Sequence, residues 1–284
     1  MYSDSKFLIF RGLSVHYRVL LPQGPVLHRA LLVPSPGQST YNWRMVVPEL
    51  LSLGCLCVLC DLPGFGYSMC GPGVPHRQDQ RARLLWGVLD EVDMEYGHSF
   101  RCWNLIGHGS AAGTVAMMAL SSPESVASLV MINPILTPIV GAPLRRLARS
   151  EPGKLFLRRW HRRHLTNRVR FRKLARWYYG KAPSWASLEE MRKPFMRMGS
   201  DASISKLVSD GYQIPLEALE GLFVPTLVLW GGRDKLLGGQ IPHKLRAHLK
   251  NAEFHLMRQA GHCAPETNSR MVCDYLRGWL RAMG

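Results

Sequence analysis

Short, mostly apolar runs alternate with longer amphipathic stretches through most of the chain. Runs of this length are typical of the buried strands of a parallel sheet. They predict strands at residues 30–33, 55–60, 104–106, 128–132, 225–230 and 253–256. Two further runs, at 7–10 and 15–19, predict a leading hairpin.

The stretches between these runs have the spacing of amphipathic helices. From Gln78 onward, apolar residues recur on one helix face, at Leu84, Leu85, Val88 and Val92. Further helices are predicted at 43–53, from Ser110 onward, at 241–249 and at 270–283. Alternation of strands with helices predicts an α/β fold, in which helices cover both faces of a parallel sheet.

This alternation stops between residues 137 and 215, where the chain is helical and basic. Thr166 and Asn167 predict the N-cap of a helix, and Gly180 predicts its end. One face of that helix carries apolar residues at helical spacing, namely Phe171, Leu174, Ala175 and Tyr178. We therefore predict a core domain formed by residues 1–136 and 216–284, and a basic helical lid inserted at 137–215.

The net charge of the chain is +16, and the predicted lid carries almost all of it. Between Arg145 and Arg197 there are 17 Lys and Arg residues but only three Glu. Such cations could steer an anionic small molecule to a pocket, or contact an anionic membrane through arginines interleaved with aromatic residues. The alternative is a solvated face whose apolar side covers a pocket. We expect no nucleic-acid partner, because no nucleic-acid-binding motif is present.

The seven cysteines do not make the even-numbered set of a disulfide framework. Cys57 and Cys60 have CxxC spacing, but residues three apart on a strand point to opposite faces. We therefore expect reduced core cysteines and no metal site. Residues 1–6 have no signal-peptide features, and no run reaches the roughly 18 apolar residues of a membrane-spanning helix. We expect a cytoplasmic protein whose membrane contact, if any, is made by the lid.

The stretch Gly107-His108-Gly109-Ser110-Ala111 lies between the strand predicted at 104–106 and a predicted helix. A strand, a tight turn of small residues and a helix form the setting of a nucleophile elbow, in which the catalytic side chain stands at the middle of the turn. The middle residue here is Gly109. The stretch therefore has the pattern of the elbow without its usual nucleophile.

Four motifs resemble those of the α/β-hydrolase superfamily, in particular its epoxide hydrolase and haloalkane dehalogenase branch, and they occur in the same order. They are Asp61-Leu62-Pro63-Gly64-Phe65-Gly66-Tyr67-Ser68, Leu105-Ile106-Gly107-His108, Trp230-Gly231-Gly232-Arg233-Asp234, and Ala260-Gly261-His262 with Glu266. The resemblance implies an α/β-hydrolase fold, with a mostly parallel eight-stranded sheet flanked by helices and an inserted helical lid. It also implies a reaction without a cofactor.

The resemblance assigns catalytic roles to Asp234 and His262. Asp234 is the expected orienting acid and His262 the expected general base, because a buried carboxylate fixes the imidazole tautomer and stabilises the imidazolium. Both residues follow predicted strands. We therefore expect both at the carboxyl edge of the sheet, where α/β folds bind ligands.

The elbow departs from the family pattern at its nucleophile. Glycine adopts the positive φ of the turn without strain, so Gly109 fits the backbone but offers no reactive atom. Ser110 supplies the nearest hydroxyl. However, an elbow centred on Ser110 would put His108 at a position that requires a small residue.

The loop after the strand at 30–33 is the second departure. The family places an N–H donor there for the oxyanion of the reaction. Ser35 and Pro36 fill these positions, and Pro36 has no N–H. A register shifted by two residues would supply the N–H of Gln38 instead.

Three functions fit this pattern. The first is a hydrolase of a small ester or thioester that uses Ser110, or a water activated by His262 and Asp234. The second is an enzyme with a His-Asp dyad and no covalent step, such as a lyase or a cofactor-free oxygenase. The third is a non-catalytic binding protein that keeps the pocket as a receptor and uses the lid as an interaction surface.

Overall fold

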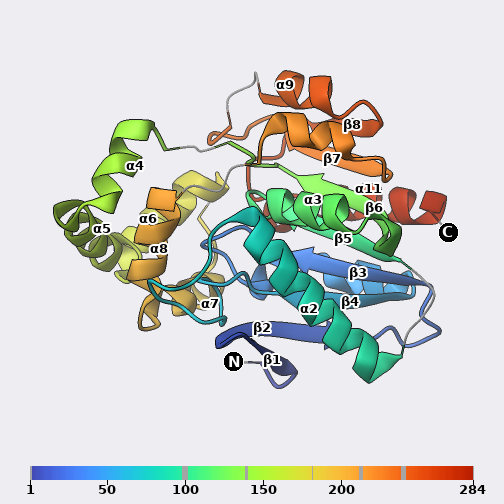
Figure 1. Ribbon diagram of the computed structural model, residues 1–284, viewed down its shortest axis with the longest axis horizontal. Helices are drawn as coiled ribbons and strands as arrows, with labels where there is room; N and C mark the ends of the chain where they lie inside the picture. Colours follow the sequence, from blue (N-terminus) through green and yellow to red (C-terminus); the bar gives the residue numbers. More distant parts are fainter. Residues whose placement is uncertain are drawn as a thin grey trace.

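The centre of the molecule is a twisted sheet of eight strands (Figure 1). The structure is a computed structural model that describes residues 2–97, 102–137, 140–180, 182–210, 214–237 and 241–283. The strands are Ser5–Phe10 (β1), Leu13–Leu20 (β2), His28–Val33 (β3), Cys55–Cys60 (β4), Trp103–His108 (β5), Val126–Ile132 (β6), Thr226–Gly231 (β7) and Ala252–Met257 (β8). Their order is β1-β2-β4-β3-β5-β6-β7-β8. Only the β1–β2 and β2–β4 pairs are antiparallel, so the predicted α/β fold with a mostly parallel eight-stranded sheet is confirmed.

Helices cover both faces of the sheet (Figure 1). One face packs against Gln78–Tyr96 (α2), Ala111–Ser121 (α3) and Ile241–His248 (α9), and the other against Val47–Ser52 (α1) and Ser269–Met283 (α11). Successive strand residues contribute to opposite layers, as Leu31 and Leu32 of β3 do. Because both layers are apolar, the inner strands read as unbroken apolar runs in the sequence.

Five α-helices form an insertion in the described part of the chain between β6 and β7. They are Ala142–Arg149 (α4), Glu151–His164 (α5), Arg168–Tyr179 (α6), Trp185–Arg192 (α7) and Ser200–Asp210 (α8), and we call them the helical insertion. As predicted, Asn167 caps α6 and Gly180 ends it in the left-handed conformation. The insertion lies beyond one end of the sheet (Figure 1). The boundaries at 137 and 215 stay predictions, because residues 138–139, 181 and 211–213 lie outside the described residues.

The helix predicted at 43–53 is wrong in its first half. The chain instead forms a short 3-10 helix, Thr40–Trp43 (η1), and α1 begins only at Val47. Pro48 stands in the first turn of α1, where its missing N–H leaves no helical bond unmade. The sequence also did not predict the short helices Pro123–Ser125 (η2), Lys193–Met196 (η3), Leu216–Gly221 (η4) and Ala264–Thr267 (α10).

The thiols of the CxxC motif point to opposite faces of β4, as predicted. Cys57 belongs to the core layer under α1 and α11, and Cys60 belongs to the layer under α2 and α3. Burial raises the pKa of the Cys60 thiol well above its usual range, which keeps it protonated and unreactive. Within the described residues, no helix has the length and apolar character needed to cross a membrane.

Candidate active site

The turn from β5 into α3 has Gly109 at its apex. Gly109 adopts a φ of +58°, and its N–H donates to the carbonyl of Ile132 on the neighbouring strand. Gly107 lies so close to α3 that a Cβ on it would stand 2.6 Å from Val115 and 2.8 Å from Ala112. Only glycine fits two residues before the apex. The turn is therefore centred on Gly109 and not on Ser110.

His262 and Asp234 form a buried pair at the carboxyl edge of the sheet. The Nδ1 of His262 lies 2.7 Å from the Oδ2 of Asp234, and both side chains are almost fully buried. The other oxygen of Asp234 accepts the N–H of Leu236 at 2.8 Å, which fixes the carboxylate. Among the described residues, the Nε2 of His262 has no hydrogen-bond partner. When Nδ1–H donates to Asp234, this free Nε2 can accept a proton.

Ser35, from the loop after β3, fills the space above Gly109. A Cβ on Gly109 would lie only 2.5 Å from the Oγ of Ser35 and 2.9 Å from its Cβ. The same Cβ would lie 3.3 Å from the Nε2 of His262. The Ser35 hydroxyl and the free nitrogen of His262 therefore border one small volume. In a chain with a side chain at the apex, that volume would hold the nucleophile.

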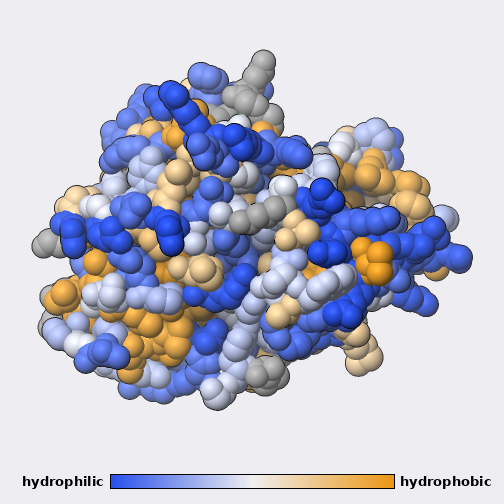
Figure 2. Space-filling model, turned by 180° about the vertical axis from the view of Figure 1, so that it is seen from behind, coloured by the Kyte–Doolittle hydropathy of each residue, from blue (hydrophilic) through white to orange (hydrophobic). Residues whose placement is uncertain are grey.

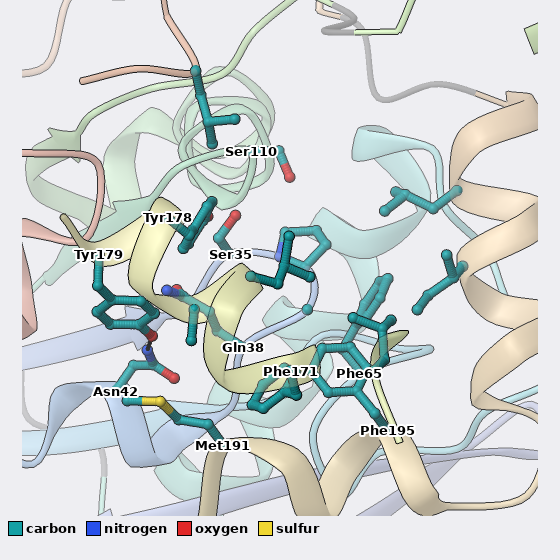
Figure 3. A pocket seen from close by; sticks show the side chains of 18 of the residues that line it. Ser35, Gln38, Asn42, Phe65, Ser110, Phe171, Tyr178, Tyr179, Met191 and Phe195 are labelled. Carbon is teal, nitrogen blue, oxygen red and sulfur yellow. Dashed lines mark hydrogen bonds between the residues drawn. The ribbon is translucent and has the colours of Figure 1, made fainter. Parts of the chain in front are cut away.

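Ser110 occupies the N-cap position of α3, directly after the apex. Its Oγ is buried and has no hydrogen-bond partner in the described part of the chain, so it is bonded neither to His262 nor to the first turn of α3. Figure 3 shows Ser35, Ser110 and Tyr178 at one end of a pocket, with Phe171 and Phe195 at the other. The role of Ser110 as nucleophile stays a prediction.

The loop after β3 has few backbone N–H groups that are free to donate to an oxyanion. The N–H of Gln38 donates to the carbonyl of Ser35 at 2.9 Å, and Pro36 has no N–H. The Gln38 side chain contacts the Nδ1 of His108 at 2.8 Å, and the Nε2 of His108 donates to the carbonyl of His262 at 2.7 Å. His108 thus joins this loop to the His262 loop. Burial, and then the neighbouring His262, lower the pKa of His108 to about 3, so its ring is neutral.

The start of α3 is a second candidate source of amide donors, although the N–H groups of Ala112 and Gly113 already donate to the carbonyls of Gly109 and Ser110 at 3.2 Å. The first N–H groups of a helix have no partner within it, and they carry the positive end of the helix dipole. α3 begins at Ala111, next to the apex. Only the N–H of Ala111, among the first three amides of α3, has no backbone acceptor in the described part of the chain.

Asp61, the first residue of the motif at 61–68, fixes the position of the loop that carries Ser35. Its Oδ1 accepts the N–H of Thr40 at 2.7 Å, and its Oδ2 accepts the N–H of Tyr67 at 2.8 Å. The ring of His16 also bonds Oδ2 at 2.8 Å. All of these groups are buried or nearly so, and the role of Asp61 is to position the loops around the site.

A cavity of about 290 Å³ lies between the turn and the helical insertion. The stripe predicted on α6 lines it, since Phe171, Leu174, Ala175 and Tyr178 all border the cavity. Most of the other lining side chains are apolar, and none of the lining residues that the structure describes is charged. A cavity of this size and composition suits a small, neutral, apolar ligand.

Two consecutive tyrosines of α6 connect the insertion to the catalytic candidates. The ring of Tyr178 lies edge-on to the ring of His262, with 5.2 Å between their centroids. The hydroxyl of Tyr179 donates to Glu266 at 2.7 Å, and Glu266 also pairs with Arg44 and accepts from Asn42. Burial raises the pKa of Glu266, and Arg44 opposes this shift. This polar cluster holds the end of α6 over the site.

Sequence reasoning did not find two of these relationships. The apolar spacing of α6 placed Tyr178 on the pocket face, but nothing in the sequence indicated its contact with His262. Ser35 was identified only as part of the oxyanion loop. Its position above Gly109 depends on contacts between the loops after β3 and β5, which no local pattern encodes.

Residues 30–274 match the family model described as "Alpha/beta hydrolase family". Among curated proteins, the chain is 27% identical over 251 residues to a 2-hydroxy-6-oxononadienedioate/2-hydroxy-6-oxononatrienedioate hydrolase of Paraburkholderia phymatum, covering 85% of this chain and 83% of the relative.

Solved structures of the same fold include a haloalkane dehalogenase of Agrobacterium tumefaciens, with a TM-score of 0.77, 19% identity and coverage of 99% of this chain and 97% of the other. They also include an enol-lactonase of Burkholderia xenovorans, with a TM-score of 0.72, 18% identity and coverage of 97% and 100%. At these identities the likeness shows the fold alone.

Proposed function

The chain belongs to the alpha/beta hydrolase family, and we propose that it hydrolyses small, neutral carboxylic esters or thioesters, with His262 and Asp234 as the base pair and Ser35 as the nucleophile. One observation carries this proposal. The Ser35 hydroxyl and the free Nε2 of His262 border the volume in which a side chain at Gly109 would stand. The hydroxyl absent from the apex is thus supplied by the neighbouring loop.

The proposed reaction has two steps. His262 Nε2 takes the proton of the Ser35 hydroxyl while the Ser35 oxygen attacks the carbonyl carbon of the substrate. The imidazolium, stabilised by Asp234, then gives that proton to the leaving alcohol or thiol. In the second step His262 removes a proton from water while the water oxygen attacks the acyl-Ser35 ester. The imidazolium then returns that proton to the Ser35 oxygen, which breaks the ester bond and releases the acid. The N-terminus of α3 faces the developing oxyanion.

The lining of the cavity supports a neutral substrate. The relative from Paraburkholderia phymatum is named for a dioate, which carries two carboxylates. Among the described residues no Lys or Arg lines the cavity, and a carboxylate buried without a partner is strongly disfavoured. The many cations of the insertion therefore do not argue for an anionic ligand, which was one of the alternatives that the charge left open.

Hydrolysis of p-nitrophenyl butyrate and of the matching hemisuccinate tests this proposal. We expect the butyrate to be the better substrate, and His262→Ala to lower kcat/KM by roughly 10²–10⁴. The exposed His243 of α9 provides a matched control, and His243→Ala should leave the rate unchanged. Equal rates for wild type and His262→Ala, or preference for the hemisuccinate, would contradict the proposal.

A binding protein without catalysis is the second candidate. It is favoured by the missing side chain at Gly109, the missing N–H at Pro36 and the occupied N–H at Gln38. Under this alternative, the apolar cavity binds a small ligand, and a range of esters and thioesters is turned over no faster by wild type than by His262→Ala.

A further inference from the structure

The outer surface of α4 and α5 combines exposed apolar side chains with arginines. On α4, Leu144 and Leu147 are 43% and 47% exposed, and on α5, Leu155 and Phe156 are each 56% exposed. Large apolar side chains exposed to this extent on neighbouring turns are unusual unless something covers them. The exposed arginines beside them are Arg146, Arg159, Arg162 and Arg163. We call these eight residues the α4–α5 face.

The two helices are close together where the apolar residues lie. A Cβ on Gly153, in the first turn of α5, would collide with the carbonyl of Leu147 on α4. On α5, Leu155, Arg159 and Arg162 are spaced at i, i+4 and i+7, on the side opposite the buried Leu157 and His161. Figure 2 shows strongly hydrophilic and hydrophobic residues side by side on the lobe formed by the insertion.

Most of the positive charge of this surface has no ion-pair partner among the described residues. Residues 142–164 contain eight Lys and Arg and one Glu. Glu151 pairs with Lys154, and Arg158 pairs with Asp201 of α8. For Arg146, Arg159, Arg162 and Arg163, the described residues provide no ion-pair partner. A partner with dispersed negative charge and an apolar interior could pair with the arginines and bury the apolar side chains of this face.

The inner side of α5 borders the cavity described above. Trp160 and Leu165, at its carboxyl end, line the cavity, and Phe156 lies one turn before Trp160 on the adjoining surface. The same helix therefore separates the apolar cavity from the basic, apolar outer face. A partner seated on the α4–α5 face would lie next to the site that we propose to accept apolar substrates.

We propose that the α4–α5 face docks the protein onto the surface of an anionic lipid bilayer. Leu144, Leu147, Leu155 and Phe156 enter the boundary between headgroups and acyl chains, and the four arginines contact the lipid phosphates. A helix with apolar residues and arginines on one exposed face has the composition of an interfacial helix. This inference concerns binding and does not depend on catalysis.

Co-sedimentation with vesicles tests the proposal. We expect the protein to pellet with vesicles of equimolar phosphatidylcholine and phosphatidylglycerol, but not with phosphatidylcholine alone. Arg159→Ala with Arg163→Ala should weaken binding roughly 30-fold, at about fivefold per arginine. Leu155→Ser with Phe156→Ser should weaken it about tenfold or more, because two apolar groups leave the interface.

Matched controls come from the core domain. Phe223 is 79% exposed, and Arg77, the N-cap of α2, and Arg83 of α2 are also exposed, all outside the α4–α5 face. Phe223→Ser, and Arg77→Ala with Arg83→Ala, should bind vesicles as wild type does. The proposal is overturned if anionic vesicles are not bound, if the core variants lose as much binding as the α4–α5 variants, or if a single-stranded oligonucleotide is retained while vesicles are not.

Discussion

Ser35 occupies the space into which a side chain on Gly109 would project. The two residues are 74 positions apart in the chain, yet the hydroxyl of one lies 2.5 Å from the Cβ position of the other. The free nitrogen of His262 faces the same volume. The space that a side chain at the turn would need is thus occupied by a serine of the neighbouring loop.

Gly109→Ser should destabilise the protein through two separate effects. The positive φ costs a non-glycine residue about 1–2 kcal/mol, and the new Cβ collides with Ser35. Ser35→Gly removes the collision, so the penalty of Gly109→Ser should be smaller in that background by about 1 kcal/mol. Chemical denaturation of the wild type, the two single variants and the double variant measures this coupling. Additive effects would show that the two side chains do not compete for one space.

Asp234→Asn should retain the fold and abolish most activity. An amide can still accept the N–H of Leu236, but it presents an NH₂ group to the Nδ1 of His262 and imposes the wrong imidazole tautomer. We expect kcat to fall on the order of 10⁴-fold with an unchanged circular dichroism spectrum. Asp274→Asn, on the exposed side of α11, is the control. A variant that keeps more than about a tenth of the wild-type kcat would exclude Asp234 from this role.

The free energy of unfolding should decrease as the pH falls below about 6.5, the ordinary pKa of histidine. Burial lowers the pKa of His108 to about 3 and, helped by Arg81, that of His76 to about 2. Between about pH 6.5 and these values, the unfolded chain binds protons that the folded protein does not. The free energy of unfolding therefore decreases toward acid pH, by up to about 1.4 kcal/mol per pH unit for each histidine.

Denaturant titrations at a series of pH values measure that slope. His76→Gln keeps an acceptor for Arg81 and removes one titrating ring, so its slope should be smaller than that of the wild type. His243→Gln, at an exposed position, should keep the wild-type slope. An unchanged slope in His76→Gln would mean that this histidine titrates alike in the folded and unfolded states.

Tyr179→Phe should loosen α6 without affecting the sheet. The variant loses the hydrogen bond to the buried Glu266, and a bond to a charged group contributes about 1.5–3 kcal/mol. Hydrogen exchange should become faster in α6, while the amides of β5 and β6 keep their protection. Tyr41→Phe removes a weaker 3.4 Å contact with Ser187 and should change little. If the amides of α6 exchange hydrogen at the same rate in Tyr179→Phe and Tyr41→Phe, the bond between Tyr179 and Glu266 does not hold α6 in place.

The sheet follows from local features of the sequence, whereas His262 and Asp234 were identified by the resemblance to the α/β-hydrolase motifs. The inner strands are buried on both faces, so their apolar runs are visible without any tertiary information, and Asp234 lies three residues after the end of β7. The helix starts that were predicted correctly have local signals as well, as Asn167 does for α6.

Two features of the structure were not predicted from the sequence: the start of α1 and the contact between the loops that carry Ser35 and Gly109. The start of α1 at Val47, later than predicted, has a local signal in Pro48. The apolar spacing of the preceding residues nevertheless favoured a longer helix. By contrast, the approach of Ser35 to Gly109 results from the pairing of β3 with β5, which brings the two following loops together. No spacing rule connects those residues, since each loop alone is compatible with several conformations.

The most direct test of the central claim is to locate the adduct of a fluorophosphonate reagent on the intact protein. Peptide mass spectrometry should find the phosphonyl group on Ser35 in the wild type and in Ser110→Ala, and no adduct in Ser35→Ala or His262→Ala. An adduct on Ser110 that survives Ser35→Ala, or hydrolysis of p-nitrophenyl butyrate by Ser35→Ala at the wild-type rate, would contradict the assignment of Ser35 as the nucleophile.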